Sequence, residues 1–215
     1  MKSTFRWEDL PEYPEELEYI LWEAREEERD LERMKIRGIT LTGMDFSTLG
    51  FHQVLFENCR FLNCRFEKCT FKLVAFHNCD LSNSDFSWSY WKECEWEEVK
   101  AVGIKAQNAN MISTEMRNCN LRYANLGESQ FDKWKVANCD LTDCFLNSCH
   151  LKEIVFRENR LVRTSFFKTP LRGMDFTSCD LEDVQVSEDG KELAGAKVDI
   201  YQAAEFVKLM GLKVV

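Results

Sequence analysis

The fold of this chain is decided by a five-residue repeat, seen plainly in the stretch Phe56-Glu57-Asn58-Cys59-Arg60-Phe61. Every fifth residue from Ile36 to Val186 is apolar, which makes 31 consecutive positions without a slip in phase. Twelve of the 16 phenylalanines stand in this column, hereafter the central column. Because hydrophobic residues form only 45% of the chain, chance does not produce such a run.

A second column, hereafter the small column, lies two residues before the central one and holds all ten cysteines. Most of its other members are also small, for example Val54, Ser84 and Thr164, and the other three positions of each repeat are mainly polar. A period of five fits neither a 3.6-residue helix nor a two-residue strand. We therefore expect a solenoid in which each repeat turns one large and one small side chain inward.

This pattern resembles the pentapeptide repeat family, whose repeats carry Leu or Phe at the centre and a small residue two positions earlier. The resemblance implies an all-β solenoid, a right-handed quadrilateral β-helix. With four repeats to a coil, the in-phase region 36–186 gives about eight coils of twenty residues. At the strand spacing of about 4.8 Å per coil, the rod is roughly 37 Å long.

One coil tests this register, because opposite sides of a coil are ten residues apart. Trp91 faces Ala101 and Trp96 faces Ala106, so two oversized side chains are matched by two undersized ones. Close packing of a narrow interior requires such compensation. Trp134 fits poorly because it stands in the small column, and we expect a local bulge or an outward rotation there.

The N-terminal part, residues 1–35, is expected to be an acidic segment with a capping helix over Pro14–Met34. A solenoid needs such a cap because its first coil exposes unpaired backbone. The apolar residues of the segment recur at helical spacing: Leu17, Ile20, Leu21, Ala24, Leu31 and Met34. Its charged residues form either the solvated face of this cap or an arm that binds a partner.

The repeats occupy residues 36–198, and residues 199–215 form a C-terminal helix and tail. The phase breaks after Val186, and Leu193 and Val198 then resume the five-residue spacing two residues out of phase. Asp199 is a suitable N-cap for the next element. The patterns predict a helix over Ile200–Met210 that ends at Gly211, followed by a short terminal strand with Leu212 and Val214.

The stretch from Val198 to Leu212 resembles the C-terminus of the quinolone-resistance (Qnr-like) subgroup of this family. In that subgroup the helix caps the rod and the tail forms a two-fold dimer, so the resemblance implies an elongated homodimer. The alternative is a monomer in which the helix is only a cap. The candidate dimerisation residues are Phe206, Leu209, Met210, Leu212 and Val214.

Composition excludes several classes of function. No window approaches eighteen apolar residues, so we expect no membrane span, and the formal charge of −9 argues against non-specific binding of nucleic acid. The cysteines form no CxxC or zinc-like spacing, so they are expected to be small core residues with free thiols, as in a cytoplasmic protein. His52, His77 and His150 are scattered. We therefore predict no catalytic residues, no metal and no cofactor, and a non-enzymatic protein; a redox or metal role is the minor alternative.

One side of the predicted rod is acidic. It contains the repeats centred on Phe56 and on every twentieth residue after it, and it carries seven acidic against three basic side chains. The candidate partner-binding residues on this side are Glu57, Glu95, Glu97, Glu98, Glu115, Glu158 and Asp175.

The Qnr-like resemblance implies a DNA mimic that binds DNA gyrase or topoisomerase IV and is linked to quinolone resistance. The alternative is an interaction rod with another protein partner. Outward apolar residues on a different side support that alternative as a candidate patch: Leu62, Val102, Tyr123 and Val162.

Overall fold

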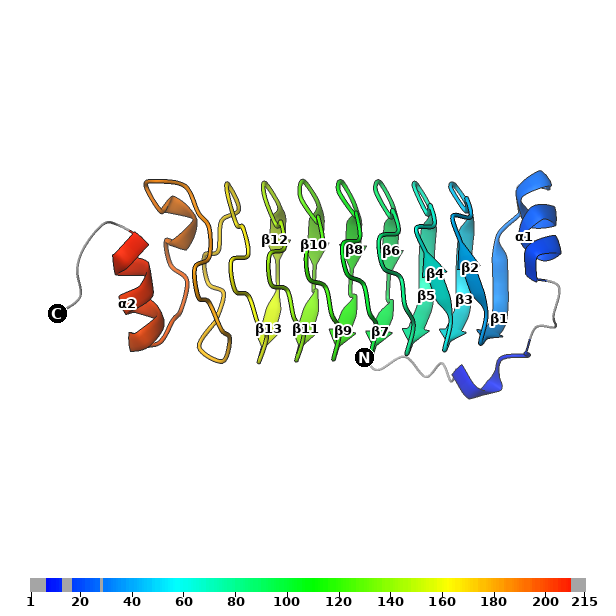
Figure 1. The fold of residues 1–215 in the computed structure, drawn as a ribbon, viewed down its shortest axis with the longest axis horizontal. Helices are drawn as coiled ribbons and strands as arrows, with labels where there is room; N and C mark the ends of the chain where they lie inside the picture. Colours follow the sequence, from blue (N-terminus) through cyan, green and yellow to red (C-terminus); the bar gives the residue numbers. More distant parts are fainter. Residues whose placement is uncertain (1–6, 13–16, 28, 210–215) are drawn as a thin grey trace.

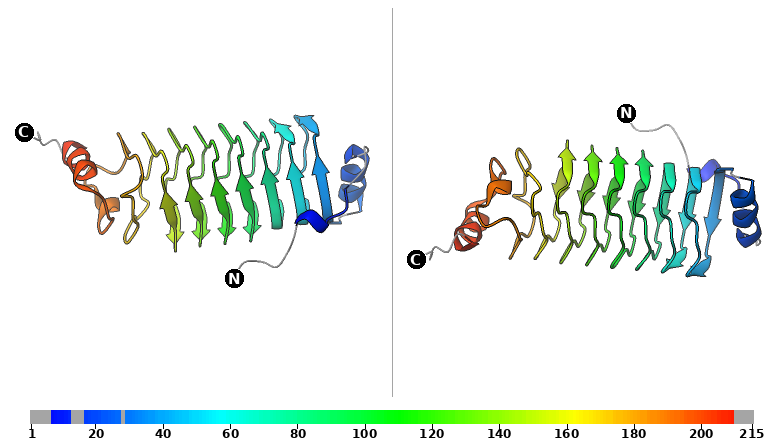
Figure 2. Two further views of the ribbon diagram at one scale, coloured as in Figure 1. Left: turned by 90° about the horizontal axis from the view of Figure 1, so that it is seen from below. Right: turned by 90° about the horizontal axis from the view of Figure 1, so that it is seen from above.

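The computed structural model describes residues 7–12, 17–27 and 29–209 and shows a straight rod with a helix at each end (Figure 1). The rod is a right-handed quadrilateral β-helix, as predicted. Its strands are short and stack in parallel from coil to coil, with partners twenty residues apart, such as Phe51 and Phe71. The two further views show the same stack of coils (Figure 2).

Two adjoining sides of the rod form one eleven-stranded parallel sheet. Side A carries β6 (Tyr90–Lys92), β8 (Asn110–Ile112), β10 (Gln130–Asp132) and β12 (His150–Lys152). Side B carries β7 (Glu95–Glu97), β9 (Glu115–Arg117), β11 (Lys135–Ala137) and β13 (Val155–Arg157). The first three coils run through the corner in longer strands: β1 (Leu31–Arg37), β3 (Gly50–Glu57) and β5 (Thr70–His77).

The other two sides have little strand structure. Side C pairs β2 (Thr40–Thr42) with β4 (Arg60–Leu62) and then continues through single bridges such as Asp80 to Lys100. Side D has only single bridges, such as Asp45 to Arg65. The strand-bearing part, from Leu31 to Arg157, makes about six turns, and bridges alone carry the stack on to Gln185. The predicted eight coils are therefore slightly too many for the part that forms strands.

The corners of the coil depend on backbone conformation two residues after each central residue. Asn58, Asn63, Asn78 and Asn83 all have φ between 50° and 59°, and Gly103 has φ 68° at the same position. Asn and Gly are the residues that enter this left-handed region at least cost. The enrichment of Asn and Gly at this position is a sequence signal for the turns, although other residues, such as Lys68, Leu73 and Trp88, adopt the same left-handed conformation there.

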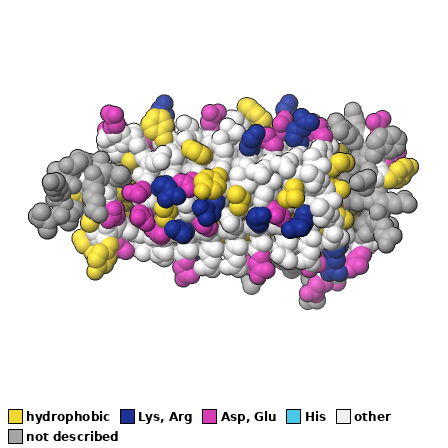
Figure 3. Space-filling model, in the orientation of Figure 1, with side chains coloured by type: hydrophobic (Ala, Val, Ile, Leu, Met, Phe, Trp, Pro, Cys, Tyr) yellow, Lys and Arg dark blue, Asp and Glu magenta, His cyan; other side chains and the backbone are white. Residues whose placement is uncertain are grey.

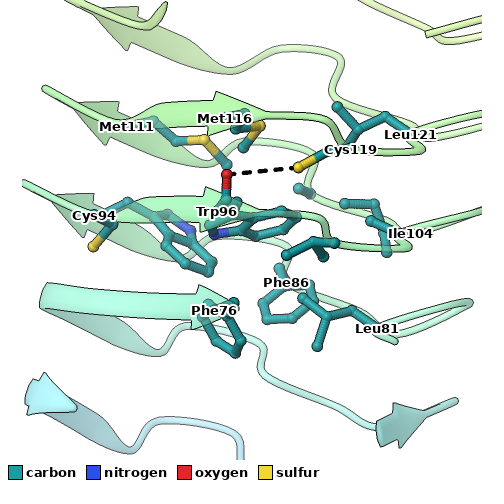
Figure 4. Close-up of a cluster of buried hydrophobic side chains, with 14 of the residues drawn as sticks. Phe76, Leu81, Phe86, Cys94, Trp96, Ile104, Met111, Met116, Cys119 and Leu121 are labelled. Carbon is teal, nitrogen blue, oxygen red and sulfur yellow. Dashed lines mark hydrogen bonds between the residues drawn. The ribbon is translucent and has the colours of Figure 1, made fainter. Parts of the chain in front are cut away.

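The central column fills the rod with stacked rings. Phe51 lies on Phe71 with centroids 5.1 Å apart and planes at 5°, and Trp91 follows on Phe71 at 3.9 Å. Trp91, Trp96, Ala101 and Ala106 are all at most 1% exposed, so the coil that combines them is closed to solvent. Figure 4 shows Trp96 between Phe76 of the coil before and Met116 of the coil after.

The small column completes backbone hydrogen bonding between coils. The Ser84 hydroxyl donates to the Phe61 carbonyl oxygen at 2.7 Å and accepts from the Cys64 N–H at 3.0 Å. Cysteine thiols do the same more weakly, as when Cys119 donates to the Trp96 carbonyl oxygen at 3.7 Å (Figure 4). This geometry explains a column of Cys, Ser and Thr, because a small donor-acceptor satisfies buried backbone groups there.

The expected bulge or outward rotation at Trp134 is wrong. Its side chain is 0% exposed, and β10 and β11 keep their pairing register with the neighbouring coils. The indole ring instead stacks inside the rod on Phe131, with centroids 4.4 Å apart. The central residue of the same repeat is Val136, whose side chain is smaller than the usual Phe or Leu and leaves room for the ring.

The predicted helix Pro14–Met34 is wrong over its last part. Helix α1 spans Leu17–Glu26, and Leu31 and Met34 lie in β1 instead. They pair with Phe51 and Val54, because Leu31 occupies the central column one repeat before Ile36 and Met34 occupies the small column of the repeat centred on Ile36. Pro14 lies outside the described residues. Ile20 and Ala24 of α1 are buried against the first coil, so the helix caps the core.

The C-terminal cap follows the sequence closely. After a turn and η2 (Lys191–Leu193), Lys197 bridges to Asp175 at a spacing of 22, which confirms the phase shift of two. Helix α2 spans Ile200–Leu209, and one Asp199 carboxylate oxygen accepts from the N–H groups of Tyr201 and Gln202, both at 2.8 Å. Asp199 is therefore the N-cap, as predicted. The expected helix end at Gly211 and the strand with Leu212 and Val214 lie outside the described residues.

Candidate interaction surface

The predicted acidic residues gather on side B. Glu95 and Glu97 flank Trp96 in β7, Glu115 lies beside Glu95 in the next coil, and Glu57 ends β3. These four are half-buried. The other three, Glu98, Glu158 and Asp175, are exposed.

Cations on the same side neutralise part of this charge. Arg117 lies 3.8 Å from the Glu97 carboxylate and also pairs with Glu115. The Glu95 carboxylate lies 3.0 Å from the imidazole Nε2 of His77, and this hydrogen bond lowers the pKa of Glu95. Arg37 pairs with Glu57 in the same way.

The carboxylates of Glu98 and Glu158 form no ion pair with any residue in the part of the chain that the structure describes. Glu98 follows β7 and Glu158 follows β13, three coils further along the rod. They are exposed and unneutralised, and they differ from Asp175, which is also in no ion pair within the described residues, because the Asp175 carboxylate accepts hydrogen bonds from Thr177; Glu98 and Glu158 are therefore well placed to attract a cationic partner.

An N-terminal segment also lies on side B. Trp7 and Leu10 pack against Leu55 and Ala75, two apolar residues that stand directly before central residues, where the chain points outward. Leu55 is 4% and Ala75 0% exposed. The inward columns do not predict this contact. The sequence signal for it is the apolar pair itself, because most other members of this outward position on side B are charged.

The apolar patch predicted on side C is only partly exposed. Tyr123 is 51% exposed, Leu62 and Val102 are half-buried, and Val162 is 2% exposed and contributes no surface. The guanidinium of Arg122 lies 5.4 Å from the centroid of the Tyr123 ring. Figure 3 shows hydrophobic side chains alternating with basic and acidic ones along the side of the rod that it faces.

Ion pairs between successive coils surround Tyr123 on side C. Arg163 contacts both carboxylate oxygens of Asp143 at 2.7 Å, and Lys100 lies 3.0 Å from Asp80. The side is therefore closely balanced in charge. A partner that binds to side C would contact the Tyr123 ring and the ion pairs near it.

The predicted dimerisation residues lie at the far end of the rod. Phe206 is half-buried and packs against the core of the last coils. Leu209 is the last residue of α2, and Met210, Leu212 and Val214 lie outside the described residues. Two large apolar side chains at the start of α2 remain open, Ile200 at 76% and Tyr201 at 81% exposed.

The cysteines occupy the interior. All ten are buried and free. Burial raises the pKa of Cys69 and of Cys94 to about 12 and that of Cys149 to about 11, which keeps these thiols protonated near neutral pH. Residues 7–12, 17–27 and 29–209 contain no group of three or more His, Cys, Asp or Glu side chains that could hold a metal ion.

A helix able to cross a membrane would need to be longer and more apolar than any in the described part of the chain.

Comparison with known proteins agrees with the repeat. A family model for a pentapeptide repeat region matches residues 30–106, and a model for eight copies of pentapeptide repeats matches residues 102–133. No curated protein sequence matches the chain.

Solved structures extend the similarity along the rod. A trypsin-treated form of QnrB1, a plasmid-mediated fluoroquinolone resistance protein, is 28% identical with a TM-score of 0.52, over 84% of this chain and 91% of that chain. HetL, a pentapeptide repeat protein involved in heterocyst differentiation regulation in Nostoc sp. strain PCC 7120, is 15% identical with a TM-score of 0.39, over 78% and 86%. The two family models, which together match residues 30–133, the unbroken repeat and the square coil show that the chain is a pentapeptide repeat protein, and the QnrB1 comparison shows that it resembles the Qnr-like members of that family.

Proposed function

We propose that this protein is a non-enzymatic binding rod that recognises a protein partner through side B, and that the partner is DNA gyrase or topoisomerase IV. The observation that carries the proposal is the likeness to QnrB1 along most of both chains. Fluoroquinolones act on these type II topoisomerases, so a Qnr-like rod is expected to bind the enzyme. The proposal includes mimicry of duplex DNA by the acidic side.

The charge pattern of side B supports the proposal that a protein partner binds there. Glu95 and Glu115 stack in successive coils, about 4.8 Å apart, and the other carboxylates are distributed along the same side of a rigid rod. Part of the row is paired with Arg37, His77 and Arg117, so Glu98 and Glu158 provide the strongest local attraction. Electrostatic matching of this kind raises the association rate and selects the partner more than it adds affinity.

We also propose that two copies associate through the C-terminal end. Ile200 and Tyr201 support this, because two large apolar side chains side by side and three-quarters or more exposed are unusual on a monomer. Phe206 packs α2 against the core of the last coils and so fixes the orientation of the helix that carries Ile200 and Tyr201. Sedimentation at micromolar concentration tests the dimer: a monomer there contradicts it.

A gyrase assay tests the main proposal. Purified protein is titrated into a DNA supercoiling reaction, with and without a quinolone, and direct binding is measured in parallel. We expect binding that weakens with salt. The variant Glu98→Lys with Glu158→Lys should lose most of it, and Asp143→Lys on side C is the matched control. No inhibition, protection or binding at tens of micromolar would contradict the proposal.

A different partner is the second candidate, and Tyr123 favours it. A half-exposed tyrosine under an arginine, on a side with balanced charge, is a common type of contact residue in protein interfaces. In that case Tyr123→Ala weakens binding of the partner while the side B reversal does not.

A further inference from the structure

The segment Trp7–Glu12, hereafter the strap, covers part of side B. It runs along the axis of the rod, across the direction of the strands. Glu12 bridges to Lys35 in the first coil, while the Lys35 N–H donates to the Pro11 carbonyl oxygen at 2.9 Å. Figure 2 shows this dark blue segment beside the first coils.

The strap then passes over the next coils. Leu10 and Trp7 cover Leu55 of the second coil and Ala75 of the third. The Trp7 side chain hydrogen-bonds the carboxylate of Glu95 in the fourth. The strap therefore occupies a site made of an apolar spot, Leu55 and Ala75, with carboxylates at its edge.

The strap matches this site in shape but not in charge. It carries Glu8, Asp9 and Glu12, and of these only Glu12 forms an ion pair within the described residues, with Arg37. Glu8 and Asp9 are exposed on the side of the rod that already carries Glu57 and Glu95. Like charges brought together oppose docking, so Glu8 and Asp9 weaken a contact that is held by the apolar side chains, the Glu12–Arg37 ion pair and the Lys35–Pro11 hydrogen bond.

We propose that a protein partner displaces the strap and binds in its place, through a segment that presents one apolar side chain flanked by lysine or arginine. The apolar side chain would occupy the spot on Leu55 and Ala75, and the cations would pair with Glu57 and Glu95. This inference rests on the proposed function in placing the partner on side B. A segment with the same apolar anchor and cations in place of Glu8 and Asp9 keeps the apolar contacts of the strap without adding negative charge beside Glu57 and Glu95.

The consequence is that the strap restrains binding. A site that is open for only a fraction of the time has an apparent affinity reduced by that fraction. Opening the strap is therefore expected to strengthen binding, whereas a strap that forms part of the binding surface would weaken it when removed.

The test compares the native chain with the variant Trp7→Ala, Leu10→Ala. The probe is a fluorescent peptide, Lys-Lys-Leu-Lys-Lys, measured by anisotropy, with Lys-Lys-Ser-Lys-Lys as the peptide control. We expect the apparent Kd for the leucine peptide to fall by about tenfold in the variant, as removal of a mostly closed state requires. Trp88→Ala, which removes an exposed tryptophan on side D, is the matched control and should leave the Kd unchanged. An unchanged or higher Kd in the strap variant overturns the proposal.

Hydrogen exchange at the Lys35 amide gives a readout that does not depend on affinity, because this N–H is bonded to Pro11 of the strap. The leucine peptide should accelerate its exchange in the native chain, and in the strap variant exchange should be fast without peptide. Slower or unchanged exchange on adding saturating peptide would show that the strap stays in place and would also overturn the proposal.

The gyrase result remains separate. If gyrase binds neither form but the leucine peptide behaves as expected, the proposed partner is wrong and the strap inference stands. If gyrase binds the native chain and the strap variant equally, and the peptide shows no gain, the strap inference is wrong and the proposed partner stands.

Discussion

Replacing Ala101 by leucine adds three carbon atoms to a coil that has no exposed surface at that point. Ala101 and Trp91 stand on opposite sides of the same coil, and both are 0% exposed. The Trp91 ring has no room to move, because it stacks on Phe71 at 3.9 Å and its indole N–H donates to the Ser89 hydroxyl at 2.6 Å. The larger side chain at position 101 therefore has to displace the Trp91 ring or distort the backbone of the coil.

The magnitude follows from two opposing terms. Three buried carbon groups would stabilise the fold by about 2.4 kcal/mol, at about 0.8 kcal/mol each, if space existed for them. Overpacked cores instead lose about 1–3 kcal/mol. The strain in the Ala101→Leu rod is therefore about 3–5 kcal/mol, and we expect the free energy of unfolding to fall by about 1–3 kcal/mol.

Urea unfolding followed by circular dichroism measures this change, with midpoints compared because a solenoid need not unfold in one step. Ala137→Leu is the matched control: the same substitution at an outward position of β11 should change stability by no more than about 0.5 kcal/mol. Adding Trp91→Leu to Ala101→Leu should recover at least half of the loss, because the pair shares one space. An Ala101→Leu variant as stable as the native chain would refute the packing of opposite sides.

Three further changes have defined outcomes. Ser84→Ala leaves the Cys64 N–H without its side-chain partner and should cost about 1–3 kcal/mol in urea unfolding, whereas Ser84→Cys should cost less. Asp199→Ala removes the N-cap of α2 and should cost about 1 kcal/mol, seen as faster hydrogen exchange in that helix. The pKa of Glu95 is lowered by His77, so its stabilising contribution is present above the ordinary glutamate value of about 4.3 and is lost as the pH falls through the lowered pKa. Glu95→Gln should therefore flatten the acid side of the stability profile, and an equally steep profile in the variant would contradict the assignment.

The two inward columns determined most of the fold from the sequence alone. Each side chain of a single-layer coil points either into the core or toward solvent. Residues that recur at every fifth position therefore share the same side, and the apolar ones are buried. That is why Phe56, Cys59 and Phe61 predict their own burial, and why Asp199 is recognisable as a helix cap. Leu31 and Met34 fit both a helical spacing and the five-residue repeat, so the prediction that they belong to the N-terminal helix was wrong. Only the pairing with Phe51 and Val54 decides between the two.

The candidate surface is less predictable than the core, because it depends on which outward side chains of neighbouring coils contact each other. The sequence placed the acidic residues on one side through the twenty-residue coil. It did not show that Arg117 lies between Glu97 and Glu115 and pairs with both, since side-chain reach rather than register sets those contacts. The repeat placed Trp134 in an inward column, but the sequence did not show that the smaller Val136 leaves room there for the indole ring.

The strap is the feature that the sequence alone could least predict. The sequence by itself determined the repeat, the two inward columns and the buried thiols, because each follows from a local period that the backbone must obey, and the coil geometry implied by the family resemblance then placed the acidic side. Only the tertiary structure decided that Trp7 and Leu10 lie on Leu55 and Ala75. These residues are more than forty positions apart and lie outside the repeat on one side of the contact, so no period relates them. A non-periodic segment is positioned by the free energy of its contacts, which exist only when the rod has formed.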